Sequence, residues 1–358
     1  MKIQAITVAD SISPQGHRLW SGLLTFPKYL LAEAKTHRIV SQDSNEIEIM
    51  LDVSLNAAKE LSRNSASSRA IPTNRLLKMV EENPFIPIAW QKEHKGMQGY
   101  EYWTDEEFGE ETKMKVADAL TNLWLKNRDE AYINASLIMK LGGTKQMANR
   151  LLEPFLWTTV LVSGTEWENF FELRAPVYEF DIPRIDKKEV FKSRIQAKEK
   201  YPVLRNFTEL DWLKANKGQA EIHMMALAEA IWDAQNESKP RQLEAGEWHI
   251  PFEDKINPQI VSRYLNHPCN PIIRISTAMA ARTSYTVVGD EKQVSYETLL
   301  GIHDKLVSNV PRHSSPMEHC AQIPSTKEYN EAIKGKEKGW FYNLRGFKSY
   351  RFILENPE

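Results

Sequence analysis

The segment from Ser62 to Pro72 constrains this chain most strongly, because it has almost nothing to bury. Its sequence, Ser-Arg-Asn-Ser-Ala-Ser-Ser-Arg-Ala-Ile-Pro, holds two guanidinium groups, four hydroxyls and one carboxamide in eleven residues. Arginine binds phosphate or carboxylate through paired hydrogen bonds, and serine and asparagine favour turns over helix interiors. We therefore predict a loop that binds an oxyanion. The alternative is a solvated serine-rich loop without a ligand.

The composition narrows the class of protein. The 358 residues are enough for two domains or for one large domain with a substantial core. A net charge of −2 argues against bulk electrostatic binding to nucleic acid or to an anionic membrane. No signal peptide or membrane-spanning run is visible, and two cysteines make neither a disulfide framework nor a zinc site. These features favour a cytoplasmic protein that recognises phosphate locally, in a pocket.

The spacing of apolar residues predicts a mainly helical chain with short strands. Residues 83–102, rich in proline, tryptophan and glycine, read as an ordered loop, and residues 175–215 read as a charged surface insertion. Strand-like runs lie at residues 3–8 and 287–294. We expect helices over residues 28–37, 41–59, 73–80, 105–141, 144–157 and 219–234.

The chain has no obvious nucleophile. Cys269 lies in His-Pro-Cys-Asn-Pro, where asparagine replaces the histidine of the Pro-Cys-His motif of the cysteine-dependent thymidylate synthases, so we interpret it as a loop or core thiol. His313, Glu318 and His319 have a spacing that is weak for zinc, and no further ligand motif accompanies them. The sequence also lacks a phosphate-binding glycine motif and a Ser-His-Asp constellation. Separated polar clusters without a nucleophile suit an enzyme whose cofactor carries the chemistry.

Taken together, these clusters resemble the flavin-dependent thymidylate synthases, the ThyX family. That family is marked by an Arg-His-Arg triplet followed by a serine and an arginine. Thr36-His37-Arg38 matches the last two members of the triplet, and Ser67 and Arg69 match the serine and the arginine. The chain departs from the pattern in having Thr36 for the first arginine and an insertion before the serine-rich segment.

Three further blocks carry the resemblance. Residues 167–174 are similar to the family's Asn-Phe-x-x-Leu-Arg segment, and residues 219–222 to its Ala-Gln-x-Glu-Ile helix start, although Lys217 stands where members have a histidine. Residues 280–285 and 313–319 resemble the Ala-Arg-x-Ser-Phe and His-x-(Ser/Thr)-Pro-Phe-Glu-His motifs, which lie near the N-terminus of compact members. The motif order is therefore permuted in this chain.

The resemblance implies a ThyX-like α/β (α+β) fold, with helices packed on a mixed or antiparallel sheet. It implies one catalytic domain over residues 1–358, with insertions at about residues 41–60 and 176–215. The implied reaction is the reductive methylation of dUMP to dTMP, with methylenetetrahydrofolate as one-carbon donor, FAD as hydride carrier and NADPH as reductant. Neither a catalytic cysteine nor a metal is implied, and the family assembles its sites in a homotetramer.

The resemblance also assigns residues. Two alternatives remain: a relative that methylates or hydroxymethylates another pyrimidine nucleotide, and a catalytically inactive nucleotide-binding paralogue. We interpret His17 and His303 as surface or structural histidines. The implied catalytic residues are Ser67, Arg69 and Arg174; dUMP would be bound by these three with Ser68 and Arg150; and FAD would be bound by His37, Arg38, Asn169, Ser284, His313, Ser315 and Glu318.

Overall fold

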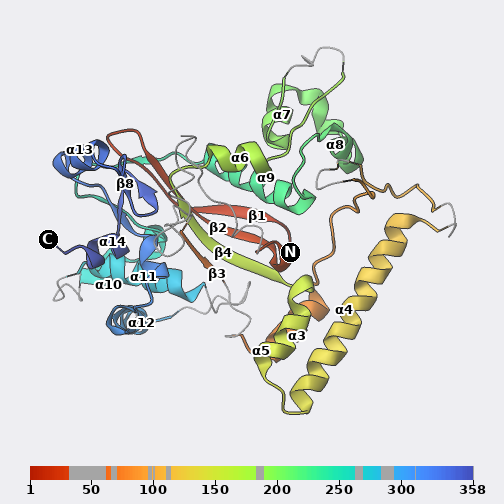
Figure 1. Ribbon diagram of the computed structural model, residues 1–358, viewed down its shortest axis with the longest axis horizontal. Helices are drawn as coiled ribbons and strands as arrows, with labels where there is room; N and C mark the ends of the chain where they lie inside the picture. The colour runs from red at the N-terminus through yellow and green to blue at the C-terminus, as the bar shows by residue number, and fades with distance from the viewer. Residues whose placement is uncertain are drawn as a thin grey trace.

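A five-stranded mixed sheet forms the centre of the fold in the computed structural model (Figure 1). The structure describes residues 1–31, 62–65 (backbone only), 71–95, 99, 101–109, 114–182, 189–262, 269–283, 294–310 and 312–357. Neighbouring strands pair antiparallel except β1 and β5, which are parallel. The strands in order across the sheet are β3 (Ser62–Ser65), β4 (Trp157–Gly164), β2 (Arg18–Pro27), β1 (Gln4–Ile12) and β5 (Arg241–Gln242).

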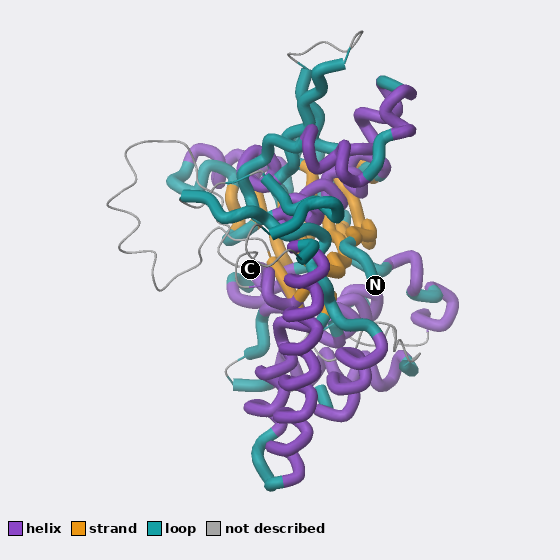
Figure 2. The backbone as a smooth tube through the Cα atoms, turned by 90° about the vertical axis from the view of Figure 1, so that its right-hand side faces the viewer, coloured by secondary structure: helices purple, strands orange, loops and turns teal. Residues whose placement is uncertain are grey.

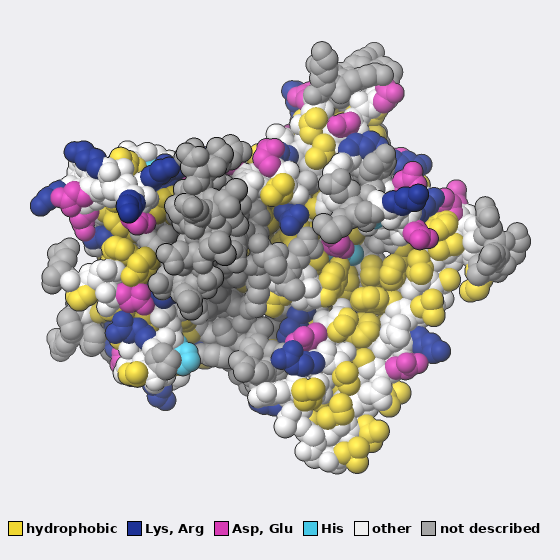
Figure 3. Space-filling view, in the orientation of Figure 1, with side chains coloured by type: hydrophobic (Ala, Val, Ile, Leu, Met, Phe, Trp, Pro, Cys, Tyr) yellow, Lys and Arg dark blue, Asp and Glu magenta, His cyan; other side chains and the backbone are white. Residues whose placement is uncertain are grey.

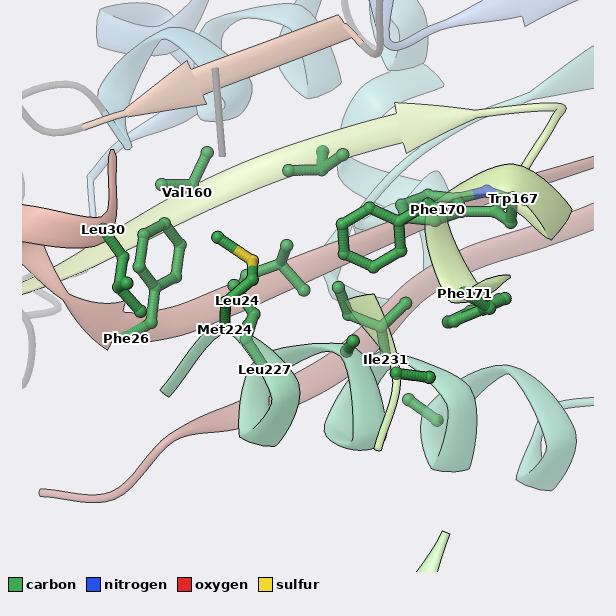
Figure 4. Close-up of a cluster of buried hydrophobic side chains, with 14 of the residues drawn as sticks. Leu24, Phe26, Leu30, Val160, Trp167, Phe170, Phe171, Met224, Leu227 and Ile231 are labelled. Carbon is green, nitrogen blue, oxygen red and sulfur yellow. The ribbon is translucent and has the colours of Figure 1, made fainter. Parts of the chain in front are cut away.

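Two helices, α6 (Glu168–Arg174) and α9 (Ile222–Glu237), cover one face of the sheet. Because side chains alternate along a strand, Val160 and Val162 of β4 point to this face and join the apolar sides of both helices. Figure 4 shows Leu227 and Ile231 of α9 directed at the strands, with Phe170 and Phe171 of α6 beside them. This cluster packs α6 and α9 on the sheet, and it thereby fixes the orientation of α6.

Trp20 anchors this face through a contact that requires a glycine. Its indole lies over Gly22, two residues along β2, where a Cβ would lie 2.0 Å from the ring atom Cη2. The ring also meets Trp167 edge-on at 5.3 Å between centroids, and its N–H donates to the Thr7 hydroxyl at 3.0 Å. Gly22 therefore gives Trp20 the space that it occupies at the centre of the fold.

The opposite face of the sheet is covered from the C-terminal half of the chain. Leu161 of β4 packs here against Phe252 and Ala280. The elements on this side include α11 (Pro271–Arg282) and the short 3₁₀ helix η6 (Ser315–Glu318). Around them lie η4 (Glu253–Lys255), α10 (Pro258–Val261), α12 (Tyr296–Ser308), α13 (Thr326–Lys334), α14 (Tyr350–Glu355), the small sheet β6 (Trp248–His249), β7 (Ala321–Gln322) and β10 (Lys348–Ser349), and the hairpin β8 (Trp340–Phe341) and β9 (Leu344–Arg345).

A helical arm projects from the body of the molecule (Figures 1 and 2). It consists of α3 (Thr73–Glu82), α4 (Val116–Lys140) and α5 (Lys145–Leu152), which share a hydrophobic cluster, and η2 (Glu153–Phe155) leads from it into β4. Gly142 ends α4 in the left-handed region, at a φ of 81°. In the described part of the chain no helix, including α4, is both long and apolar enough to cross a membrane.

Residues 175–182 and 189–217, here called the 175–217 unit, have a hydrophobic cluster of their own, which includes Tyr178, Phe191 and Trp212. Arg194 joins the unit to α9, since its guanidinium pairs with Glu229 at 3.2 Å. The segment is therefore a folded unit packed on α9, and not only a charged excursion on the surface. Its elements are α7 (Arg194–Lys200), η3 (Pro202–Asn206) and α8 (Glu209–Ala215).

The predicted mixed α/β class is confirmed, and most predicted elements exist with changed bounds. The helix predicted to start at residue 105 begins at Val116, because Phe108 and Lys115 pair in an antiparallel bridge before it. The helix predicted to reach residue 157 ends at Leu152, where Pro154 enters a 3₁₀ turn and β4 follows. Residues 28–30 are a 3₁₀ turn (η1, Lys28–Leu30), and residues 32–37 of that prediction lie outside the described residues. The helix predicted at 41–59 and most of the strand-like run at 287–294 also lie outside them.

Candidate functional site

Strand β3 places the start of the polar segment at the edge of the central sheet. Its residues pair antiparallel with β4, Ser62 opposite Ser163 and Ser65 opposite Val160. The segment thus begins as a strand, whereas the sequence predicted a loop throughout, because pairing with β4 satisfies the backbone groups of one side. Its other end is also fixed, since the buried Asn149 side chain donates to the Ile71 carbonyl at 3.0 Å.

The 3₁₀ helix η6 lies beside β3, on the face of the sheet opposite α9. This contact brings together two polar motifs that are far apart in the sequence, the serine-rich segment and residues 313–319. Pro316 and Met317 are the buried residues of η6, whereas His313 and Ser315 are exposed. Of the predicted flavin ligands, His313 and Ser315 are therefore open to a ligand at the edge of the sheet.

A buried chain of hydrogen bonds ties η6 to the sheet. Nδ1 of His319, directly after η6, lies 2.8 Å from Oγ of Ser163, and that oxygen lies 2.5 Å from Oγ of Ser21. Ser21 in turn lies 2.8 Å from Nε2 of His249, whose Nδ1 is 2.9 Å from Oγ of Ser11. All five side chains are buried. The chain crosses three strands and so fixes the position of η6 relative to β3.

Both histidines in this series of hydrogen bonds, His249 and His319, are neutral. Burial lowers the pKa of His249 and of His319 from 6.5 to about 3. Nε2 of His319 is buried with no hydrogen-bond partner in the described structure, so protonation would bury a second N–H group that no acceptor meets. Their role in this geometry is therefore to position η6 as neutral rings.

Glu318 is engaged in an ion pair that also supports η6. Its carboxylate accepts from the Arg351 guanidinium at 2.7 Å, and Arg351 bonds Glu355 one helical turn further along α14. The Glu318 side chain is 17% exposed, which leaves it little access to a ligand. The predicted role of Glu318 as a flavin ligand is thus less suited to the geometry than a role in fixing η6 on α14.

The remaining described site residues lie elsewhere. Asn169 and Arg174 are half-buried on α6, across the sheet from η6. Arg150 is exposed on α5, next to the asparagine that holds Ile71. The structure therefore joins the serine-rich segment to η6 and to α5, and it places α6 on the other face. The predicted residues His37, Arg38, Ser67, Ser68, Arg69 and Ser284 lie outside the described residues.

The two cysteines and the histidines His17 and His303, which we did not assign to the site, make contacts typical of structural residues. Burial raises the pKa of Cys320 to about 11 and also raises that of Cys269, whose sulfur lies 3.3 Å from the Tyr350 hydroxyl. His303 is buried between Asp304 and Tyr350, and His17 lies 2.6 Å from the Tyr329 hydroxyl. Within the described ranges no three His, Cys, Asp or Glu side chains are grouped to hold a metal ion.

Sequence reasoning missed the partners of His319. His249 lies in a short strand between Trp248 and Ile250 and carries no local sign of a contact with Ser21, which lies on β2. Only strand pairing and the packing of η6 bring these groups together. No protein-family model and no curated protein matches this sequence.

Proposed function

We propose that this protein is a flavin-dependent thymidylate synthase that methylates dUMP to dTMP. The observation that supports this most is the position of η6 beside β3. Two motifs that resemble separate parts of the ThyX pattern, about 250 residues apart, meet at one sheet edge. Since polar clusters that are remote in sequence gain function by converging on a ligand, this edge is the proposed place of the flavin.

Three of the described residues have side chains suited to the proposed ligands. His313 and Ser315 are exposed and offer hydrogen bonds to a flavin or its phosphates. Arg174, on the other face, is suited to the phosphate of dUMP, because a guanidinium binds phosphate oxygens in pairs. When bound, FAD supplies the hydride that reduces the transferred carbon, and NADPH is the proposed reductant.

The separation of α6 from η6 by the sheet favours a site shared between subunits. In our proposal Asn169 and Arg174 serve the site of a neighbouring copy in a homotetramer, and η6 serves its own. The protein would work in the cytoplasm, where the two cysteines, which form no disulfide, stay reduced. The proposed partners are small molecules, without nucleic acid or membrane.

The experiment is a visible spectrum followed by a product assay. Purified protein should carry or take up FAD, seen as flavin absorbance, and should form dTMP from dUMP only when methylenetetrahydrofolate, FAD and NADPH are all present. A different methylated or hydroxymethylated nucleotide would indicate the relative with another substrate. Nucleotide binding without flavin uptake or product would indicate the inactive paralogue.

Arg174 provides the sharpest variant for this site. We expect Arg174→Ala to weaken dUMP binding by about 1.5–3 kcal/mol, the typical contribution of a hydrogen bond to a charged group. Arg205→Ala is the matched control, because Arg205 is exposed on η3, in the separate 175–217 unit. Equal dUMP affinity of the two variants, measured by calorimetry, would remove Arg174 from the site.

A further inference from the structure

Helix α4 exposes more apolar surface than is usual for a helix of a monomeric protein. Of its 25 residues only Ala135 is buried. Leu123, Ile133 and Leu137 are 57%, 62% and 49% exposed. Figure 3 shows hydrophobic side chains gathered over the projecting arm that contains α4. Contiguous apolar surface of this kind marks an interaction site in a soluble protein.

The exposed apolar residues Leu123, Ile133 and Leu137 lie on one side of α4, at positions of a coiled-coil seam. Steps of three and four residues alternate along the whole helix, which is the pattern that keeps a stripe facing a partner helix. The opposite side of α4, with Trp124, Ala131 and Ala135, packs against α3 and α5. We call the side that carries Leu123 the outer stripe; it consists of the partly exposed Val116 and Ala119 and the exposed Leu123, Lys126, Glu130, Ile133, Leu137 and Lys140.

The outer stripe is symmetric about Arg128. If a second α4 runs antiparallel to the first with its twofold axis at this position, Leu123 of each helix faces Ile133 of the other, and Ala119 faces Leu137. Lys126 faces Glu130, and the twofold axis repeats that contact. The last pair sets Val116 against Lys140, whose aliphatic stem is able to cover it. Every position of the stripe thus meets a compatible side chain.

The charges at the centre of the stripe are available for this pairing. In the described part of the chain, neither Lys126 nor Glu130 has an ion-pair partner. Arg128 itself points inward, where its guanidinium donates to the Val80 carbonyl at 3.3 Å and pairs with Asp129. The helix is about 38 Å long, since each residue adds about 1.5 Å, which is enough for three heptads.

We propose that the outer stripe binds the same stripe of a second copy of this chain, antiparallel and about a twofold axis at Arg128. A twofold interface is self-complementary, so one exposed stripe supplies both sides. The Lys126–Glu130 contacts fix the register, and the leucine and isoleucine pairs supply the apolar burial. This pairing does not depend on the proposed enzymatic activity.

The first test is the mass of the full chain in solution, measured by sedimentation equilibrium. We expect a dimer, or a larger assembly with an even number of copies, in the micromolar range. The double variant Leu123→Glu, Ile133→Glu should halve the mass of the assembly without changing the circular dichroism spectrum, because both side chains are exposed in a single copy. A wild-type monomer throughout this range would overturn the proposal.

The second test examines the register by exchanging charges. Lys126→Glu alone and Glu130→Lys alone each place like charges opposite each other at both contacts, and each should raise the dissociation constant about tenfold, because two attractive pairs become repulsive. A mixture of the two single variants should associate as tightly as the wild type, since opposite charges then face each other at both contacts. Lys78→Glu on α3, whose partner Glu82 lies one turn along, is the matched control. Equal association of all variants would overturn the antiparallel register.

Discussion

The buried chain from His319 to Ser11 predicts a loss of stability in mild acid. An unfolded chain protonates histidine below its ordinary pKa of 6.5, whereas the folded protein keeps His319 neutral down to about pH 3. Lowering the pH therefore favours the unfolded state, and the contribution of this group is complete above pH 6.5 and is lost as the pH falls toward 3. Burial of the ring lowers the pKa of His319, and the buried Nε2 has no hydrogen-bond acceptor in the described structure to receive an added proton.

The magnitude follows from the size of the shift. Between pH 8 and pH 5 the free energy of unfolding should fall by about 2 kcal/mol on account of His319, since each pH unit below 6.5 contributes about 1.4 kcal/mol. In His319→Asn the amide replaces Nδ1, keeps a hydrogen bond to Ser163 and cannot take up a proton. The variant should be less stable at pH 8 because of the lost packing, but should lose about 2 kcal/mol less than the wild type on acidification.

The assay is urea unfolding at pH 8 and pH 5, followed by tryptophan fluorescence and circular dichroism. Only the difference between the two proteins is interpreted, because groups remote from residue 319 titrate alike in both, among them Asp233, whose pKa burial raises to about 6. His94→Asn is the control, as His94 is exposed. If His319→Asn and the wild type lose the same stability between pH 8 and pH 5, the neutral buried imidazole is refuted.

Two further predictions concern the core and the cysteines. Gly22→Ala should destabilise the protein by about 1–3 kcal/mol, because the new methyl group collides with the Trp20 ring, whereas Gly301→Ala on α12, where nothing lies within 4 Å, should be neutral or stabilising; equal melting temperatures of the two variants would contradict the contact. The double variant Cys269→Ala, Cys320→Ala should retain dTMP formation, because burial raises the pKa of both thiols and so disfavours a thiolate nucleophile. Loss of turnover in a folded double variant would indicate a cysteine mechanism instead.

The sequence predicted the elements whose signals are local. The strand-like run at residues 3–8 predicted β1, and the apolar spacing over residues 105–141 and 219–234 predicted α4 and α9, which begins at Ile222. These features depend on neighbours within a few turns, and such neighbours are visible in the chain itself. The observed bounds differ from the predicted ones where a turn such as Glu153–Phe155 intervenes.

For the candidate site, too, the sequence showed the local features and the structure showed which segments meet. The residue types of 62–72 and 313–319 indicated polar binding segments, but their meeting at one sheet edge followed only from the structure. Strand β4 was not predicted from the sequence, and without β4 neither the pairing of β3 nor the Ser163–His319 bond has a basis.

The sequence by itself thus identified the helices α3, α4, α5 and α9, the polar segments at 62–72 and 313–319, and two thiols that lack the sequence context of a nucleophile. Tertiary structure decided which of them meet, that His249 and His319 are neutral, and that α6 and η6 lie on opposite faces of the sheet. The physical reason is that local propensity acts over a few residues, whereas strand pairing and desolvation depend on groups hundreds of residues apart.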